Sequence, residues 1–307
     1  MSLLAKATGG KQVKPQINVF MGIPKIGKTT LAAKFEKPFF LDLENRSFHV
    51  DVQRLTGNEV TSLEQIQSLI EELTVKPHDY KSFTIDSAES LEDVIHSDIC
   101  KRGGVESIEQ YDGGYGKGYV RAQEIMRDLM MKLQTMRDKR GMTVNIVAHT
   151  ATRNFSDPAT NAQFTRYEMR VNGKLGAVVR DLADNLFFIT HKYSTFTDKA
   201  TKKTKALGDG DRVVYTEWRP AFDAGNTLGL PFEIDLDDFM ESYMKAGDAL
   251  KPKSEAELRE EIQGMIKHLD DETRTKAVSR LTDAKTTAEL QTLKDKIVLL
   301  LKPTGGK

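Results

Sequence analysis

The feature that most constrains this chain is a glycine-bounded segment near its N-terminus. Residues 22–29 read GIPKIGKT and fit the pattern G-x-x-x-x-G-K-[ST] at every fixed position. Glycines let the backbone curl so that successive N–H groups point inward at an anion, and a following helix presents its positive end to the same anion. An apolar, β-prone run over 17–21 precedes the segment, and a helical pattern over 28–35 follows it. The segment is therefore predicted to be a phosphate-binding loop between a strand and a helix.

This loop predicts ATP and Mg²⁺ as cofactors. We expect the Lys28 ammonium to reach the β- and γ-phosphates and the Thr29 hydroxyl to bind Mg²⁺. The residues expected to surround the phosphates are Gly22, Ile23, Pro24, Lys25, Ile26, Gly27, Lys28, Thr29 and Thr30.

Three further strand ends carry polar groups suited to phosphoryl transfer. Asp86 ends the run SFTID and is the expected second Mg²⁺ ligand, although it or Ser87 would also suit a helix N-cap. Glu44 ends the run FFLDLE and is the expected catalytic base, with Asp42 a buried or capping partner; the alternative is a solvated loop residue. His149 follows TVNIVA and is expected to sense the γ-phosphate, unless it only satisfies a strand end.

Strands alternate with helices along most of the chain, which predicts an α/β fold with a mainly parallel central sheet flanked by helices. We expect three regions: a flexible basic arm over 1–16, an ATPase core over 17–248, and a helical appendage over 249–307 with helices near 255–268, 271–281 and 287–301. The core strands are expected over 17–21, 38–43, 81–85, 143–148, 186–190 and an antiparallel 213–218, and the core helices over 28–35, 61–73, 88–100, 119–140, 173–182 and 235–245.

In this order, the phosphate loop, FFLDLEN, SFTIDSAESL and NIVAHT resemble the RecA-like recombinase ATPases. The element YGKGY over 115–119 further resembles phage-encoded RecA-like nucleotide-binding proteins, some of which are single-strand-annealing ATPases. The resemblance covers roughly residues 17–232. It implies a RecA-like P-loop NTPase fold, catalytic roles for Lys28, Glu44 and His149, and ATP bound between the protomers of a homo-oligomer.

The resemblance also implies two loops that hold single-stranded DNA, over 102–118 and 150–170. Basic residues interleaved with aromatic ones suit phosphate neutralisation and base stacking. A single-strand-binding protein is a further expected partner. The residues expected to touch DNA are Arg102, Lys117, Arg153, Phe155, Arg166 and Arg170.

RecA-like proteins commonly present a Lys or Arg near the last core strands to a neighbour's γ-phosphate. Arg219 is the expected residue here, with Lys192 and the lysines of 199–205 as rivals.

Composition excludes several classes of protein. The chain has 45 basic residues (lysine and arginine together) and 45 acidic ones (aspartate and glutamate together). This balance argues against a histone-like or polybasic membrane-binding protein. Cys100 is the single cysteine, so no intramolecular disulfide forms, and the histidines lack metal-site spacing. No secretory signal or apolar run of ~18 residues is present, so we expect a cytoplasmic protein, in the host cytoplasm if phage-encoded, with no membrane partner.

Three alternatives stay open at this point. A helicase loader or partner-remodelling ATPase would use the helical appendage to dock a protein. A small-molecule phosphotransferase is disfavoured by the D-x-E strand and by the absence of an Arg-rich lid. A nucleotide-dependent binding module would bind ATP without hydrolysing it.

Overall fold

A computed structural model of the protein describes residues 7, 13–156, 162–197, 204–250 and 254–301. The chain divides into two compact units, Lys14–Ala249 and Leu250–Lys307 together with Met1–Val13. Most of the expected basic arm, including Lys6 and Lys11, and the lysines at 199, 202 and 203 lie outside the described residues.

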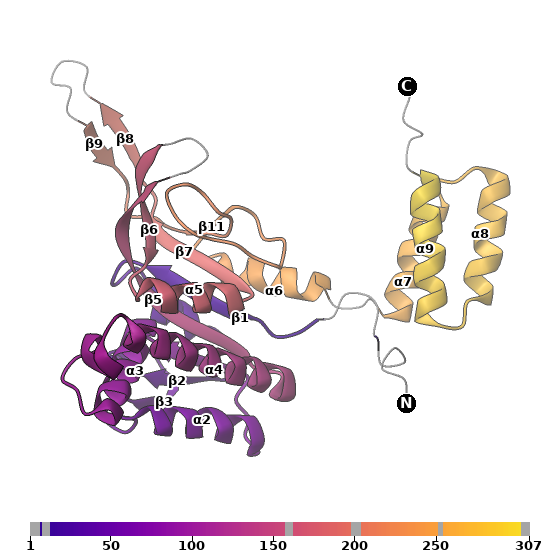
Figure 1. The fold of residues 1–307 in the computed structure, drawn as a ribbon. Coiled ribbons are helices and arrows are strands. Elements are labelled where there is room, and N and C mark those ends of the chain that lie inside the picture. Colours follow the sequence, from indigo (N-terminus) through magenta and orange to yellow (C-terminus); the bar gives the residue numbers. More distant parts are fainter. Residues whose placement is uncertain (1–6, 8–12, 157–161, 198–203, 251–253, 302–307) are drawn as a thin grey trace. The chain divides into compact units, whose positions relative to one another are not determined.

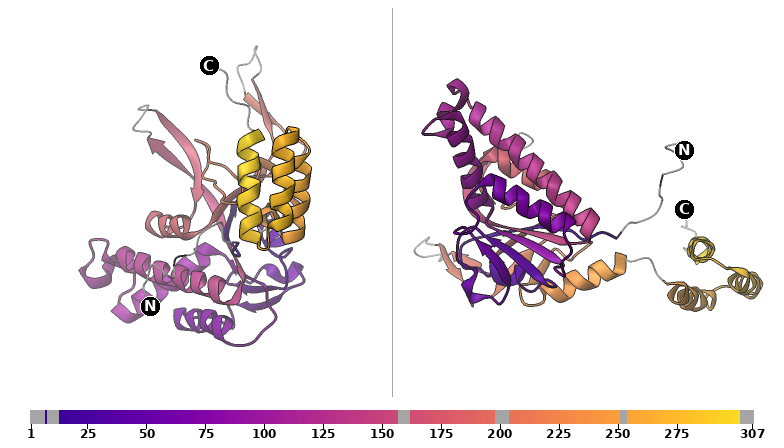
Figure 2. Two further views of the ribbon diagram at one scale, coloured as in Figure 1. Left: turned by 90° about the vertical axis from the view of Figure 1, so that its right-hand side faces the viewer. Right: turned by 90° about the horizontal axis from the view of Figure 1, so that it is seen from below.

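The larger unit is built on a mostly parallel sheet with helices on both faces, so the predicted α/β P-loop fold is confirmed (Figures 1 and 2). The strand that carries His149 lies between the phosphate-loop strand and the Asp86 strand, which brings the three carboxyl ends to one edge. From one side to the other the strands are β11 (Glu233–Asp235), β10 (Arg212–Tyr215), β7 (Asn185–His191), β1 (Ile17–Gly22), β5 (Thr143–Ser156), β4 (Ser82–Asp86), β2 (Pro38–Asp42) and β3 (Gln53–Thr56).

Alternating side chains of β1 fill two separate layers of core. Ile17 and Val19 join the larger cluster with the helices of one face. Phe20 instead contacts Phe187 and Phe239 on the opposite face, with ring centroids 5.5 Å and 5.9 Å apart. The helices of this unit are α1 (Lys28–Ala32), α2 (Leu63–Val75), α3 (Ala88–Gly103), α4 (Lys117–Arg140), α5 (Gly173–Leu182) and α6 (Phe239–Leu250), with 3₁₀ turns η2 (Ser47–His49) and η3 (Ile108–Gly113).

The segment 150–170, predicted to be a loop, is largely a β-hairpin. Strand β5 continues past the central sheet and pairs antiparallel with β6 (Gln163–Met169), from Thr150 opposite Met169 to Ser156 opposite Gln163. Threonine and aromatic residues favour paired strands, and this preference outweighs the polarity that indicated a loop. Figure 1 shows the hairpin projecting beyond the edge of the central sheet.

Two other expectations need smaller corrections, and a third is confirmed. The glycine-rich segment 102–118 holds the turn η3 and the start of α4. The helix expected over 235–245 begins at Phe239, because 233–235 pairs with β10 as a strand. Strand β10 is antiparallel to β7 as predicted, and a ribbon of β8 (Ser194–Thr197) and β9 (Thr204–Leu207) lies between them in sequence.

The smaller unit contains three helices with a core of their own: α7 (Glu255–Ile266), α8 (Asp271–Asp283) and α9 (Thr287–Leu301). Capping boxes begin two of these helices, formed by Ser254 with Glu257 and by Thr286 with Glu289. The buried apolar side chains include Leu258, Ile262, Ile266, Leu281, Leu290 and Ile297. Among the described helices, none has the length and apolarity needed to cross a lipid bilayer.

Candidate nucleotide site

The phosphate loop depends on glycine at both of its ends. A Cβ at Gly22 would overlap the carbonyl oxygen of Ile189 on the neighbouring strand. Gly27 has φ of 111°, which side chains other than glycine's rarely allow, and the space beside it is taken by Arg212 and Leu236. Both fixed glycines of the motif are therefore required, Gly22 because a side chain would overlap the neighbouring strand and Gly27 because of its backbone conformation.

Lys28 lies inside this loop with only 4% of its surface exposed. Its ammonium donates to the carbonyl oxygens of Gly22 and Ile23 at 3.0 Å and 2.9 Å, and lies 3.3 Å from Nδ1 of His149. Burial lowers the pKa of Lys28 to about 8, although nearby carboxylates partly oppose this. Lys28 is therefore a desolvated cation positioned to bind phosphate oxygens.

Thr29 and Asp86 meet as the sequence predicts for a Mg²⁺ site. The Thr29 hydroxyl donates to Oδ2 of Asp86 at 2.6 Å. Burial raises the pKa of Asp86 to about 6, with the Thr29 hydrogen bond opposing that shift. A hydroxyl and a buried carboxylate are ligands that Mg²⁺ accepts, and a bound divalent cation would offset the cost of burying the charge.

Glu44 lies just beyond β2 at the same edge. Its Oε1 accepts a hydrogen bond from the Ser87 hydroxyl at 2.6 Å and lies 3.1 Å from Nε2 of His149. These contacts, with that to His149 the largest, lower the pKa of Glu44 to about 2 despite partial burial. Asp42 is buried and accepts the backbone N–H groups of Arg46 and Ser47, so it closes the turn that carries Glu44, as expected.

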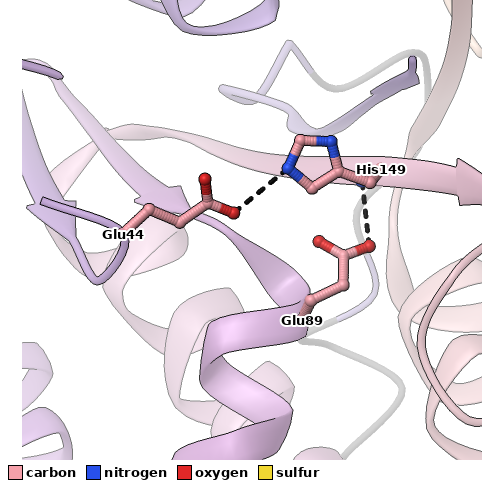
Figure 3. A group of neighbouring side chains, drawn as sticks. All are labelled: Glu44, Glu89 and His149. Carbon is pink, nitrogen blue, oxygen red and sulfur yellow. Dashed lines mark hydrogen bonds and ion pairs between the residues drawn. The ribbon is translucent and has the colours of Figure 1, made fainter. Parts of the chain in front are cut away.

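His149 connects Lys28 to Glu44. Figure 3 shows its contact with Glu44. A charged ammonium can only donate, so Nδ1 accepts from Lys28, and the proton of the neutral imidazole is then on Nε2, which donates to Glu44. The result is a directed chain of hydrogen bonds from Lys28 through His149 to Glu44.

Glu89 is a member of this site that the sequence reasoning missed. Its Oε1 accepts the backbone N–H of His149 at 2.9 Å, and the residue is 9% exposed (Figure 3). Its position in the first turn of α3, just after the Asp86–Ser87 strand end, is the signal that was available.

Glu44, Glu89 and His149 offer metal-ligating atoms that lie within 4.8 Å of one another. Both ring nitrogens of His149 are already engaged, by Lys28 and by Glu44. A metal on this trio would have to break one of those bonds, so Thr29 and Asp86 suit Mg²⁺ better.

A cavity of about 390 Å³ opens beside these groups. Arg170, one of the residues expected to touch DNA, lines this cavity. Its backbone N–H donates to the carbonyl oxygen of His149 at 3.0 Å. The lining residues are Pro24, Glu44, Arg46, Ser90, His149 and Arg170.

The other residues expected to touch DNA lie in varied surroundings. Arg102 pairs with Asp98 at 2.7 Å, and Lys117 pairs with Asp112 at 2.9 Å, both at the surface. Arg153 donates to the Val171 carbonyl at 3.0 Å and keeps a partly exposed side chain.

Arg166 is the clearest departure from the DNA-loop expectation. It is 6% exposed, forms an ion pair with Asp223, and its guanidinium lies 5.3 Å from the Phe155 ring centroid. Because the hairpin turns this side chain inward, Arg166 supports the packing of the hairpin and is not available to a DNA backbone.

Arg219, expected to act on a neighbouring protomer, lies in a tight turn outside the cavity lining. Its guanidinium stacks on Phe232 at 3.8 Å from the ring centroid. The rival Lys192 pairs with Glu233 at 2.6 Å.

A family model described as an AAA domain matches residues 14–228. The chain belongs to the AAA domain family. The match includes the phosphate loop, Glu44, Asp86 and His149, and ends before α6 and the three-helix unit. An AAA domain is an ATPase module of the P-loop type, so the prediction of a nucleotide-binding P-loop protein is confirmed at that level. Sequence comparison with curated proteins finds no match.

Proposed function

We propose that this AAA domain protein hydrolyses ATP with Mg²⁺. One observation carries the proposal: Lys28, Thr29, Asp86, Glu44 and His149 come from four separate segments and converge at one edge of the sheet. Phosphoryl transfer needs a cation on the phosphates, a metal site and a group that orients water, and these residues supply each of them.

Glu44 is the proposed water-activating group. With its pKa at about 2 it is ionised at neutral pH, yet it is a weak base while His149 and Ser87 donate to it. If Lys28 turns from His149 to the phosphates, Nδ1 loses its donor, and the imidazole can then rotate away from Glu44 with its proton still on Nε2. Nucleotide binding would then strengthen Glu44 as an acceptor for water.

The test is ATP hydrolysis by the full chain and by Glu44→Gln. We expect turnover that requires Mg²⁺ in the wild type, and a loss of about 100-fold or more in Glu44→Gln with ATP binding retained. Absence of turnover in the wild type, or an unchanged rate in Glu44→Gln, contradicts the proposal.

We further propose that the substrate on which the ATPase acts is single-stranded DNA, in recombination or annealing, with the protein working as a homo-oligomer. The support is the β5–β6 hairpin, which starts at His149 and carries Arg153 and the paired rings of Phe155 and Phe164, 5.3 Å apart. Aromatic and basic groups on such an arm suit bases and phosphates.

Titrating ATPase activity with single-stranded DNA at two salt concentrations tests this part. We expect stimulation at low salt that weakens steeply at high salt. Phe155→Ala should reduce the stimulation and leave the basal rate intact. No response to DNA at either salt concentration contradicts the DNA part and leaves ATP hydrolysis standing.

A second candidate is a helicase loader or partner-remodelling ATPase. The observation in its favour is the three-helix unit, which has its own core and lies beyond the AAA domain match. Deleting residues 250–307 discriminates between the two: DNA stimulation that survives favours action on DNA, and loss of a protein partner with retained basal ATPase favours docking.

A further inference from the structure

We propose that Arg170 acts on the γ-phosphate of the nucleotide bound by its own chain. This inference rests on the proposed ATP hydrolysis and changes the expectation that Arg219 of a neighbouring protomer does so. The role would make Arg170 a catalytic residue for this reaction.

The hairpin places Arg170 beside the site. Thr150 pairs with Met169, so His149 and Arg170 are the next opposed pair, joined by the bond from Arg170 N–H to the His149 carbonyl at 3.0 Å. Directly opposed residues of antiparallel strands project their side chains to the same side. His149 contacts Lys28, and both His149 and Arg170 line the cavity beside Pro24 of the phosphate loop.

Among the described residues, the Arg170 side chain lines the cavity without an acidic partner. Arg170 is exposed, and within the described part of the chain no carboxylate forms an ion pair with its guanidinium. Other arginines of this region are engaged: Arg166 with Asp223, and Arg153 with the Val171 carbonyl.

A bound triphosphate would give Arg170 an anionic partner. As the bond to the leaving group lengthens, Lys28 and a second cation would together stabilise the negative charge on the γ-phosphoryl oxygens. Of the two arginines that line the cavity, Arg46 lies 3.8 Å from an oxygen of Glu44, whereas Arg170 forms no ion pair with a carboxylate of the described residues.

Two binding measurements test the contact without depending on turnover. Fluorescent ADP and a non-hydrolysable fluorescent ATP analogue are titrated into wild type, Arg170→Ala, Arg170→Lys and Arg127→Ala, the last an exposed arginine on α4 as control. We expect Arg170→Ala to weaken the ATP analogue about 10-fold or more and ADP less than about 3-fold, since a charge-assisted hydrogen bond to the γ-phosphate is lost. Equal losses for both nucleotides, or none, overturn the proposal.

Turnover gives the catalytic readout. Arg170→Ala should lower kcat by about 100-fold or more, Arg170→Lys should recover part of it, and Arg127→Ala should match wild type. A normal kcat in Arg170→Ala overturns the inference, whereas an inactive wild type overturns ATP hydrolysis and leaves the nucleotide comparison to decide on Arg170.

Mixing Arg170→Ala with Glu44→Gln decides which chain the arginine serves. If Arg170 serves its own chain, every protomer in the mixture lacks one essential group and the activity stays at the sum of the two variants. Activity above that sum means that a Glu44→Gln protomer lends its Arg170 to a neighbour, which overturns the proposal. The melting temperature of each Arg170 variant, expected within about 2 °C of wild type for an exposed side chain, excludes misfolding as the cause.

Discussion

The phosphate loop and the β5–β6 hairpin both reach the nucleotide site, and they do so in different ways. The loop supplies adjacent residues, Gly22 to Thr29, whose arrangement follows from local backbone geometry. The hairpin supplies His149 and Arg170, which stand far apart in sequence and meet only because the strands between them pair. A local motif therefore identifies the type of site, whereas strand pairing in the hairpin determines that His149 and Arg170 lie beside it.

Lys28→Ala tests the loop and should have the largest effect. Removing the buried ammonium takes away the main cation for the phosphates, so we expect ATP hydrolysis to fall by about 1,000-fold or more and ATP binding to weaken strongly. Turnover and nucleotide titration measure both. Retained tight binding of ATP would show that the backbone amides and the hairpin, rather than Lys28, dominate the site.

Arg166→Ala tests the hairpin as a packed element. It leaves Asp223 without its buried partner, although Arg180 remains 3.2 Å away, and we expect a loss of about 3 kcal/mol in the free energy of unfolding. Urea denaturation measures this, with Arg153→Ala as a more exposed control. A loss below about 1 kcal/mol would mean that the hairpin does not depend on this ion pair.

Asp86→Asn tests the contact between the phosphate loop and Asp86 through the pH dependence of stability. The pKa of Asp86 is about 6 in the folded chain and near 3.8 unfolded, so the carboxylate reduces stability above pH 6, and this penalty disappears as the pH falls through 6 towards 4. We expect Asp86→Asn to be roughly 2 kcal/mol more stable than wild type at pH 8 without Mg²⁺. The gain should vanish near pH 4 and should be reduced by Mg²⁺, as followed by thermal melting. A gain independent of pH would contradict this.

His149→Ala tests the end of the site that the hairpin supplies. Its effect on turnover should be smaller than that of Lys28→Ala. Without the imidazole, Glu44 loses one of its two donors, so the pKa of Glu44 should rise from about 2 towards its ordinary value. The imidazole also orients the Glu44 carboxylate, and the higher pKa does not replace that contact, so we expect a kcat lowered about 30-fold with little change in KM. The acidic limb of the pH–rate profile should shift upward. An unshifted acidic limb would show that the Ser87 hydrogen bond alone keeps the pKa of Glu44 low.

The sequence allowed the phosphate loop, Asp86, Glu44 and His149 to be predicted because each lies in a local motif or at the end of an apolar strand. Parallel strands bring such ends together, so topology completed the site. Glu89 was missed because its role comes from a helix turn meeting the backbone of a strand distant in sequence. Arg166 was assigned to DNA because a polar, aromatic segment does not reveal which side chains a hairpin turns inward. The same segment does not reveal that Arg170 ends up opposite His149, beside the phosphate loop.

Strand β5 has a mechanical consequence. Its first half pairs with β1 and β4 within the central sheet, and its second half forms one leg of the hairpin, with no break in the strand between them. At about 3.3 Å per residue, residues 150–156 extend about 20 Å past His149. The strand is therefore built as a lever: a small tilt at His149 would become a displacement several times larger at Ser156.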